Sequence, residues 1–109
     1  MKNDAENVRV GLLGICGVYA GAAILADKAP IVIGRDPRLC NLILNGKRIS
    51  RKHCSIWYDF NKGMYVITDY SMNGVFTETG ERLKRGWPIL MKHEKVLYIA
   101  TPENSFKLI

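Results

Sequence analysis

The chain has 109 residues, enough for one domain with a hydrophobic core and too few for two domains of ordinary size. Hydrophobic residues make up 48% and charged residues 24% of the chain, a balance that excludes an intrinsically disordered protein. With 16 Lys and Arg against 10 Asp and Glu, the net charge is +6, which favours an anionic partner such as nucleic acid, a membrane surface or a phosphorylated protein.

We expect a polar, flexible segment at residues 1–9, followed by a single folded domain at residues 10–109. The three cysteines, Cys16, Cys40 and Cys54, are widely spaced and odd in number. This pattern fits neither a disulfide framework nor the paired cysteines of a zinc site. We therefore expect reduced thiols and a cytoplasmic domain.

The first apolar stretch, from Val10 to Ala26, runs for 17 residues without a charge and falls at the lower end of the length range of a membrane helix. It contains four glycines, each of which weakens a helix by roughly 1 kcal/mol relative to alanine. It also lacks the basic start of a signal peptide. We predict buried strands here and no membrane insertion, with a membrane segment, a signal segment or a soluble helix as alternatives. Residues 17–25, GVYAGAAIL, are interpreted as strand, bend and strand, and APIVIG as a third strand.

Short apolar runs alternate with turn residues over the rest of the chain: NLIL, CSIWY, MYVITD, VF, KVLYIA and SFKLI. Strand alternation in CSIWY places Cys54 and Ile56 on one face and Trp57 on the other, and in MYVITD it separates Tyr65 and Ile67 from Met64, Val66 and Thr68. No ten residues have a helical period. The pattern predicts an all-β sandwich whose functional residues lie on loops at one end.

Three polar loops interrupt these strands: GRDPRLC at 34–40, GKRISRKHC at 46–54 and DYSMNG at 69–74. They carry Gly34-Arg35, then a Ser50-x-x-His53 motif that begins 15 residues after Arg35, then Asn73-Gly74 starting 23 residues after the serine. In order and spacing, these motifs resemble the forkhead-associated (FHA) domain. The resemblance covers nearly the whole chain, from about residue 10 to the C-terminus.

The resemblance implies a twisted β-sandwich of about eleven mostly antiparallel strands, whose loops at one end recognise phosphothreonine in a partner protein. It implies a non-catalytic signalling and protein–protein interaction module without cofactor or metal. We expect such a module to be part of a larger polypeptide and to bind neither nucleic acid nor membrane.

Phosphothreonine carries about −1.5 to −2 charges at neutral pH and three strong acceptor oxygens. The resemblance implies that Arg35 is its main ligand, since a guanidinium offers a planar fork of donors. It also implies that Ser50 donates its hydroxyl to the phosphate and that Arg51 adds a backbone or side-chain donor. Two alternatives stay open: Arg35 covers the core, or Ser50 is itself a kinase target, since Lys47 and Arg48 precede it.

Further residues are expected to hold the peptide and the loops. By the resemblance, Asn73 binds the peptide backbone beside the phosphothreonine, although Asn-Gly is also the strongest short hairpin signal. His53 packs inward and braces the loops through hydrogen bonds to backbone, with Gly34 and Gly74 as structural support. His53 and Cys54 could also suggest a metal site or a nucleophile, but adjacent strand residues point to opposite faces.

One position departs from the family pattern. Many members have Ser or Thr directly before Asn-Gly, where it adds a polar contact to the phosphate, but this chain has Met72. Losing one hydrogen bond to a charged group weakens binding by roughly 1.5–3 kcal/mol unless Ser71 or neighbouring amides replace it. A phospho-independent interaction domain of the same fold is therefore an alternative function.

The basic residues beside these loops allow other interpretations. Lys47 and Arg48 lie on the loop that in this family meets residues after the phosphothreonine, so we hypothesise a preference for acidic or polar residues there. Nucleic-acid binding is a weaker alternative, because aromatic residues do not interleave with this basic loop as a stacking surface requires. Arg82, Lys84 and Arg85 are predicted to form a solvated face.

Overall fold

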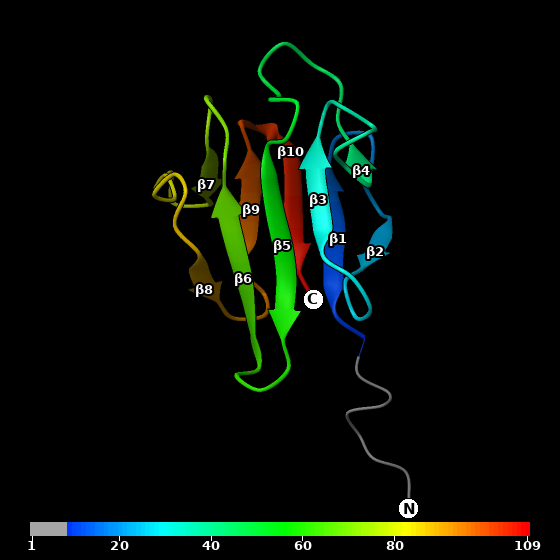
Figure 1. The fold of residues 1–109 in the computed structure, drawn as a ribbon, viewed down its shortest axis with the longest axis vertical. Helices are drawn as coiled ribbons and strands as arrows, with labels where there is room; N and C mark the ends of the chain where they lie inside the picture. Colours follow the sequence, from blue (N-terminus) through cyan, green and yellow to red (C-terminus); the bar gives the residue numbers. More distant parts are fainter. Residues whose placement is uncertain (1–8) are drawn as a thin grey trace, which may run out of the picture.

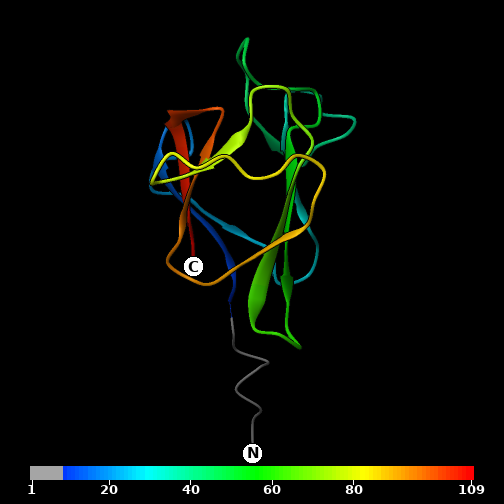
Figure 2. The same cartoon turned by 90° about the vertical axis from the view of Figure 1, so that its left-hand side faces the viewer.

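The computed structural model describes residues 9–109, so nearly all of the polar segment predicted at 1–9 lies outside the described residues. Ten strands form two five-stranded sheets that pack face to face (Figures 1 and 2). The first sheet has the order β2 (Ala23–Leu25), β1 (Gly11–Cys16), β10 (Thr101–Leu108), β9 (Val96–Ile99) and β7 (Val75–Thr77). The second has the order β4 (Leu42–Ile43), β3 (Ile31–Gly34), β5 (Cys54–Asp59), β6 (Met64–Asp69) and β8 (Ile89–Met91).

Pairing between strands is antiparallel except at β3 and β4, which are parallel. The predicted all-β, mostly antiparallel sandwich is therefore confirmed, with ten strands in place of about eleven. Within residues 9–109, no helix is long and apolar enough to cross a membrane.

The apolar stretch at the start of the chain forms the hairpin of β1 and β2, but its bend lies earlier than predicted. Residues 17–21 form a turn, in which the Ala20 amide donates to the Gly17 carbonyl (3.1 Å) and the Ala22 amide donates to the Tyr19 carbonyl (2.9 Å). The strand predicted at the beginning of GVYAGAAIL is wrong for this reason. Burial is also uneven, because β2 is an edge strand and Leu25 is exposed.

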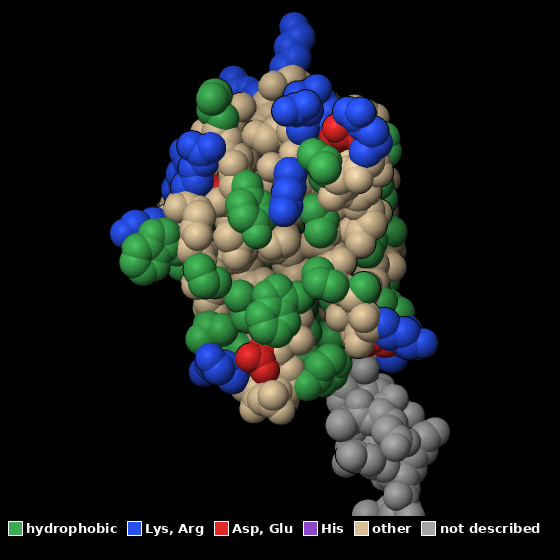
Figure 3. Space-filling view, in the orientation of Figure 1, with side chains coloured by type: hydrophobic (Ala, Val, Ile, Leu, Met, Phe, Trp, Pro, Cys, Tyr) green, Lys and Arg blue, Asp and Glu red, His purple; other side chains and the backbone are tan. Residues whose placement is uncertain are grey.

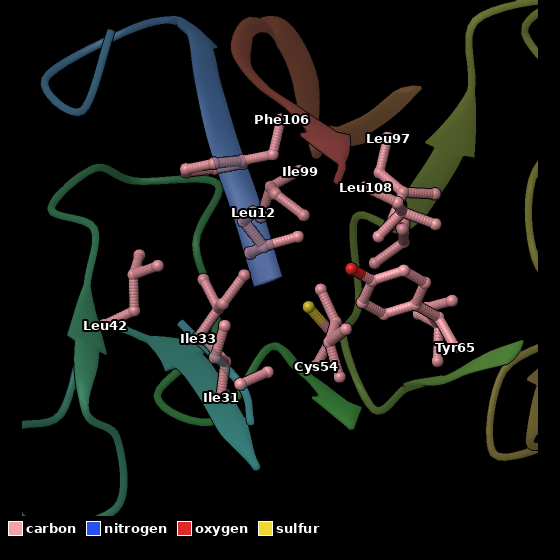
Figure 4. Packing of buried hydrophobic residues seen from close by; sticks show 14 of the residues in the cluster. Leu12, Ile31, Ile33, Leu42, Cys54, Tyr65, Leu97, Ile99, Phe106 and Leu108 are labelled. Atoms are coloured by element: carbon pink, nitrogen blue, oxygen red, sulfur yellow. The ribbon is translucent and has the colours of Figure 1, made fainter. Parts of the chain in front are cut away.

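The core fills the space between the sheets with side chains from both of them (Figure 4). As predicted, Cys54 and Ile56 of β5 point into this core and Trp57 points outward. On β6, Tyr65 and Ile67 are fully buried. Each fully buried Leu or Ile stabilises the fold by roughly 1.5–3 kcal/mol. The core therefore fixes the strand ends from which the polar loops emerge.

Tyr65 joins the two sheets at one end of the sandwich. Its hydroxyl accepts a hydrogen bond from the Gly11 amide (2.8 Å) and contacts the carbonyl oxygens of Gly11 and Ile109. Burial raises the pKa of Tyr65, which keeps the phenol protonated as a donor. This end carries the C-terminus and the start of β1, and the polar loops lie at the opposite end (Figure 1).

Candidate functional site

Three loops meet at the upper end of the sandwich in Figure 1. They connect β3 to β4, β4 to β5 and β6 to β7. Between them lies a shallow depression of about 250 Å³, lined by Arg35, Lys47, Ile49, Ser50, Arg51, Met72 and Asn73. The structure thus brings together five of the six residues predicted to bind the ligand. The sixth, Arg48, lines the neighbouring cavity of about 410 Å³ with Lys47, Ala100 and residues at the start of β10.

Arg35 is anchored to the β4–β5 loop by its backbone and by one side of its guanidinium. Its amide donates to the Ser50 carbonyl (3.1 Å), and its Nε donates to the Ile49 carbonyl (3.0 Å). Among the described residues, its two terminal nitrogens make no hydrogen bond and no ion pair. The guanidinium is therefore fixed in orientation and keeps its donor fork for a ligand.

Ser50 joins the β4–β5 and β6–β7 loops. Its Oγ accepts a hydrogen bond from the Met72 amide (3.3 Å), which leaves the hydroxyl hydrogen for an acceptor in the depression. The side chain is half-buried and bound to a second loop. This setting argues against the alternative that Ser50 is a kinase target.

His53 lies beneath both loops and is fully buried. Its Nε2 donates to the Gly74 carbonyl (2.8 Å) and its Nδ1 accepts from the Ser50 amide (3.1 Å). These two partners require the neutral ring with its hydrogen on Nε2. Burial lowers the pKa of His53, and the bond to Gly74 only partly opposes this effect.

His53 sets an expected pH dependence of stability. Because folding lowers its pKa below the usual value of 6.5, the unfolded chain binds this proton more readily than the folded chain. The contribution of His53 to the free energy of unfolding is complete above pH 6.5 and is lost as the pH falls through the folded-state pKa. Urea unfolding at several pH values between about 7.5 and 5 measures this loss.

The control for this prediction removes the titrating group itself. A His53→Gln variant should flatten the slope of stability against pH. A wild-type stability that stays constant or rises between pH 7 and about pH 5.5 would contradict the assignment.

A buried carboxylate that the sequence analysis did not single out organises the β6–β7 loop. Asp69 Oδ1 accepts from the amide (2.8 Å) and the hydroxyl of Ser71, and its Oδ2 accepts from the Val75 amide (3.2 Å). The Ser71 hydroxyl in turn accepts from the Gly74 amide (2.7 Å). An Asp two residues before a Ser in a turn is a recognisable signal for such side-chain to backbone bonds.

This network bears on two suggestions from the sequence. Ser71 is fully buried and its hydroxyl is engaged by Asp69 and Gly74, so it does not reach the phosphate in place of Met72. Arg82 is not merely part of a solvated face, because its Nη2 donates to the Ser71 carbonyl (3.1 Å) and lies 3.6 Å from Asp69 Oδ2. Its guanidinium thus lies beside the fully buried carboxylate of Asp69.

Close approach of neighbouring atoms explains the two glycines of the motifs. A Cβ on Gly34 would lie 2.2 Å from the Arg51 carbonyl oxygen, so a side chain there would push the β4–β5 loop away from Arg35. Gly74 has φ +96°, a left-handed conformation that favours glycine. A Cβ at this position would lie 2.9 Å from Arg82 Nε. Both positions therefore exclude a side chain.

Asn73 and Met72 lie at the outer edge of the depression. Asn73 Nδ2 donates to the Arg48 carbonyl (3.1 Å), and its side-chain oxygen keeps its capacity to accept from a ligand. The Met72 side chain is 76% exposed and offers no donor. At this position only the backbone amide of Met72, turned toward Ser50, contributes polarity.

Cys54 takes no part in this chemistry. It is fully buried in the core, and burial raises the pKa of its thiol well above the usual value. A thiol that stays protonated is a poor nucleophile and a poor metal ligand.

Comparison with known proteins places this geometry in a family. The family model of the FHA domain matches residues 31–100. The meiosis-specific serine/threonine-protein kinase MEK1 of Saccharomyces cerevisiae is 32% identical in an alignment of 83 residues that covers 71% of this chain and 16% of the kinase. The chain therefore spans less than a fifth of the length of that relative.

Two solved structures show the same fold. The FHA domain of the CT664 protein from Chlamydia trachomatis is 25% identical, with a TM-score of 0.77 over 94% of this chain and 97% of that chain. The MEK1 FHA domain in complex with a HOP1 phosphothreonine peptide is 27% identical, with a TM-score of 0.65 over 81% of this chain and 85% of that chain. With the family model over more than half of its residues and this fold around them, the chain belongs to the FHA domain family.

Proposed function

We propose that this chain is a non-catalytic recognition module that binds phosphothreonine in a partner protein through the depression around Arg35. The observation that carries the proposal is the Arg35 side chain, which lines the depression and is held at Nε by the Ile49 carbonyl (3.0 Å), so that its terminal nitrogens keep their donors for a ligand. The similar MEK1 FHA domain has been solved with a phosphothreonine peptide, which supports the same ligand class here.

In this proposal the phosphate meets donors of three kinds. Arg35 supplies a bidentate, charge-assisted contact, and Ser50 donates its hydroxyl hydrogen. Arg51 adds a donor from its exposed side chain or its backbone. Because these groups are held by the core and by His53 before the ligand arrives, little ordering entropy opposes binding.

The peptide on either side of the phosphothreonine is held by the outer edge of the depression. Asn73 fixes the extended backbone through its side-chain amide. Lys47 and Arg48 face the residues that follow the phosphothreonine and favour acidic ones. An acidic residue after the phosphothreonine therefore raises affinity, which titrations of paired peptides measure.

Met72 gives a variant that should gain affinity. Met72→Thr adds a hydroxyl donor at the edge of the depression, where the methionine side chain is now exposed. One hydrogen bond to a charged group contributes roughly 1.5–3 kcal/mol, so the affinity for a phosphothreonine peptide should rise about tenfold or more. Isothermal titration compares wild type, Met72→Thr and Met72→Val. Valine has the shape of threonine but lacks the hydroxyl. Equal gains for Thr and Val, or no gain for Thr, would contradict a phosphate contact at this position.

The phospho-independent alternative has a direct test. A double variant, Arg35→Ala with Ser50→Ala, should lose the partner if recognition depends on phosphate. Unchanged partner binding by the double variant would favour association through a face of the sandwich instead. Because the chain covers only 16% of the MEK1 kinase, the catalytic activity of that relative is not assigned to it.

We also propose a cytoplasmic location within a larger signalling protein, where a bound phosphothreonine brings that protein to its partner. The cysteines support a reducing compartment, since Cys16, Cys40 and Cys54 are all free. Peptide rather than nucleic acid is the proposed ligand, because the depression presents a guanidinium fork and a hydroxyl and no exposed aromatic ring among its lining residues.

A further inference from the structure

A second cationic surface lies beside the candidate site. We call Lys52, Tyr70 and Arg85 the flanking surface, with Lys84 and Trp87 at its margin. Its residues come from three segments: the end of the β4–β5 loop, the β6–β7 loop and the connection from β7 to β8. In Figure 3, most of the Lys and Arg side chains visible on this face gather toward the same upper end.

The flanking surface is ordered by contacts of its own. The Lys52 ammonium lies 4.4 Å from the centre of the Tyr70 ring, and Arg85 Nε donates to the Tyr70 carbonyl (3.4 Å). Arg85 lies in the connection from β7 to β8. This connection is hydrogen-bonded to β6, because the Gly86 amide donates to the Asp69 carbonyl (2.7 Å). Tyr70 is 38% exposed and contacts both cations, Lys52 through its ring and Arg85 through its carbonyl. These contacts hold both charges at one residue without neutralising them.

No carboxylate compensates these charges within residues 9–109. The ion pairs of the described chain involve neither Lys52, Lys84 nor Arg85. Asp69, the acidic residue nearest in sequence to Tyr70, is fully buried and bound to Ser71 and Val75. The flanking surface is therefore a site of uncompensated positive charge, which favours an anionic group from outside the chain.

The position of the surface relative to the phosphate site follows from the contacts between two loops. Three hydrogen bonds join the β4–β5 and β6–β7 loops in series: Asn73 Nδ2 to the Arg48 carbonyl (3.1 Å), the Met72 amide to Ser50 Oγ (3.3 Å) and the Tyr70 amide to the His53 carbonyl (2.9 Å). Ser50 lies in the middle of this series. Arg48 marks one end of it and the flanking surface marks the other.

We propose that the flanking surface binds a second anionic group of the same peptide, an acidic or phosphorylated side chain that precedes the phosphothreonine. This inference rests on the proposed function, in which Lys47 and Arg48 face the residues after the phosphothreonine. An extended peptide that follows the series of contacts between the two loops then places the residues before the phosphothreonine near Tyr70. We place the second anion three residues before the phosphothreonine as the test position, since three extended residues span about 10 Å.

The experiment uses the full chain and three phosphothreonine peptides: one with neutral flanks, one with glutamate three residues before the phosphothreonine and one with glutamate three residues after it. For wild type, the preceding glutamate should raise affinity roughly three- to tenfold at low salt, and the gain should shrink at high salt. A Lys52→Gln, Arg85→Gln variant should lose this gain. It should keep its affinity for the neutral peptide and its response to the following glutamate.

The matched control removes two charges elsewhere, with Lys62→Gln and Lys92→Gln at exposed positions outside both surfaces, and should behave as wild type. A preceding glutamate without effect, or a gain that persists in the Lys52→Gln, Arg85→Gln variant, would overturn the assignment of the flanking surface alone. Failure of the neutral peptide to bind in preference to its unphosphorylated form would overturn the proposed function and the flanking surface with it.

The last measurement titrates the chain with a single-stranded oligonucleotide. Tyr70 and Trp87 are exposed rings beside cations, an arrangement on which nucleic-acid bases can stack. We expect weak oligonucleotide binding that does not distinguish wild type from the Lys52→Gln, Arg85→Gln variant. Tight binding that this variant abolishes and Arg35→Ala leaves intact would overturn the peptide assignment in favour of nucleic acid.

Discussion

Replacement of Arg35 by alanine is expected to lower the affinity for a phosphothreonine peptide roughly 100-fold or more. The change removes two charge-assisted hydrogen bonds, each worth about 1.5–3 kcal/mol. It also removes the bond from Nε to the Ile49 carbonyl, which aligns the β4–β5 loop. Isothermal titration measures the loss, and urea unfolding establishes that the variant remains folded.

Two further arginine variants make this result specific. Arg35→Lys keeps the charge, but lysine has no fork and cannot hold the Ile49 carbonyl and the phosphate together, so it should recover only part of the affinity. Arg38 lies on the same loop, and its guanidinium is paired with Asp36 (3.0 Å). The hydrogen bond from Arg38 holds the pKa of the Asp36 carboxyl below its usual range. Arg38→Ala should therefore change affinity less than about threefold, and equal losses for Arg35 and Arg38 would point to general charge attraction.

The Asp69→Ala substitution is expected to lower the free energy of unfolding by about 3 kcal/mol. The Asp69 carboxylate is fully buried and accepts hydrogen bonds from Ser71 and Val75, with Arg82 3.6 Å away. Alanine leaves these donors without their acceptor in a place that water does not reach. Urea unfolding measures the loss, and the phosphopeptide affinity should fall as well, because the β6–β7 loop loses the bonds that shape it.

Asp59 is the matched control for this substitution. It ends β5, where its carboxylate accepts from the amides of Asn61 (3.0 Å) and Lys62 (3.2 Å) in the β5–β6 turn. Asp59 is half-buried, so water can replace the carboxylate and Asp59→Ala should lower stability by only about 0.5–1 kcal/mol. If Asp69→Ala lowered it no more than this, the buried network would not be what orders the β6–β7 loop.

Local patterns predicted the parts of the fold that depend on neighbouring residues. Alternation placed Ile56 inside and Trp57 outside, because side chains in a strand point to opposite faces. The bend at residues 17–21 was misplaced, because several glycines in that stretch offered equally good turn positions and hydrogen bonding selected among them. The resemblance to the FHA domain, carried by the three motifs, predicted which loops gather, and the sandwich fold brings them to one end.

Contacts between distant segments could not be predicted in this way. The attachment of Arg82 to the Ser71 carbonyl depends on how the β7–β8 connection returns to the end of β6. Lys52, Tyr70 and Arg85 are likewise separated in sequence and meet only through the fold. The bond from the Ser71 hydroxyl to Asp69 is local and the sequence pattern signals it, but its burial depends on how the fold closes around the turn.

The most direct test of the phosphothreonine assignment is the affinity of the chain for one peptide in two forms, with threonine and with phosphothreonine at the same position. We expect the phosphorylated form to bind at least about 100-fold more tightly, since the donors of Arg35 and Ser50 find acceptors only on the phosphate. Equal affinity for the two forms of a cognate peptide would contradict the phosphothreonine assignment.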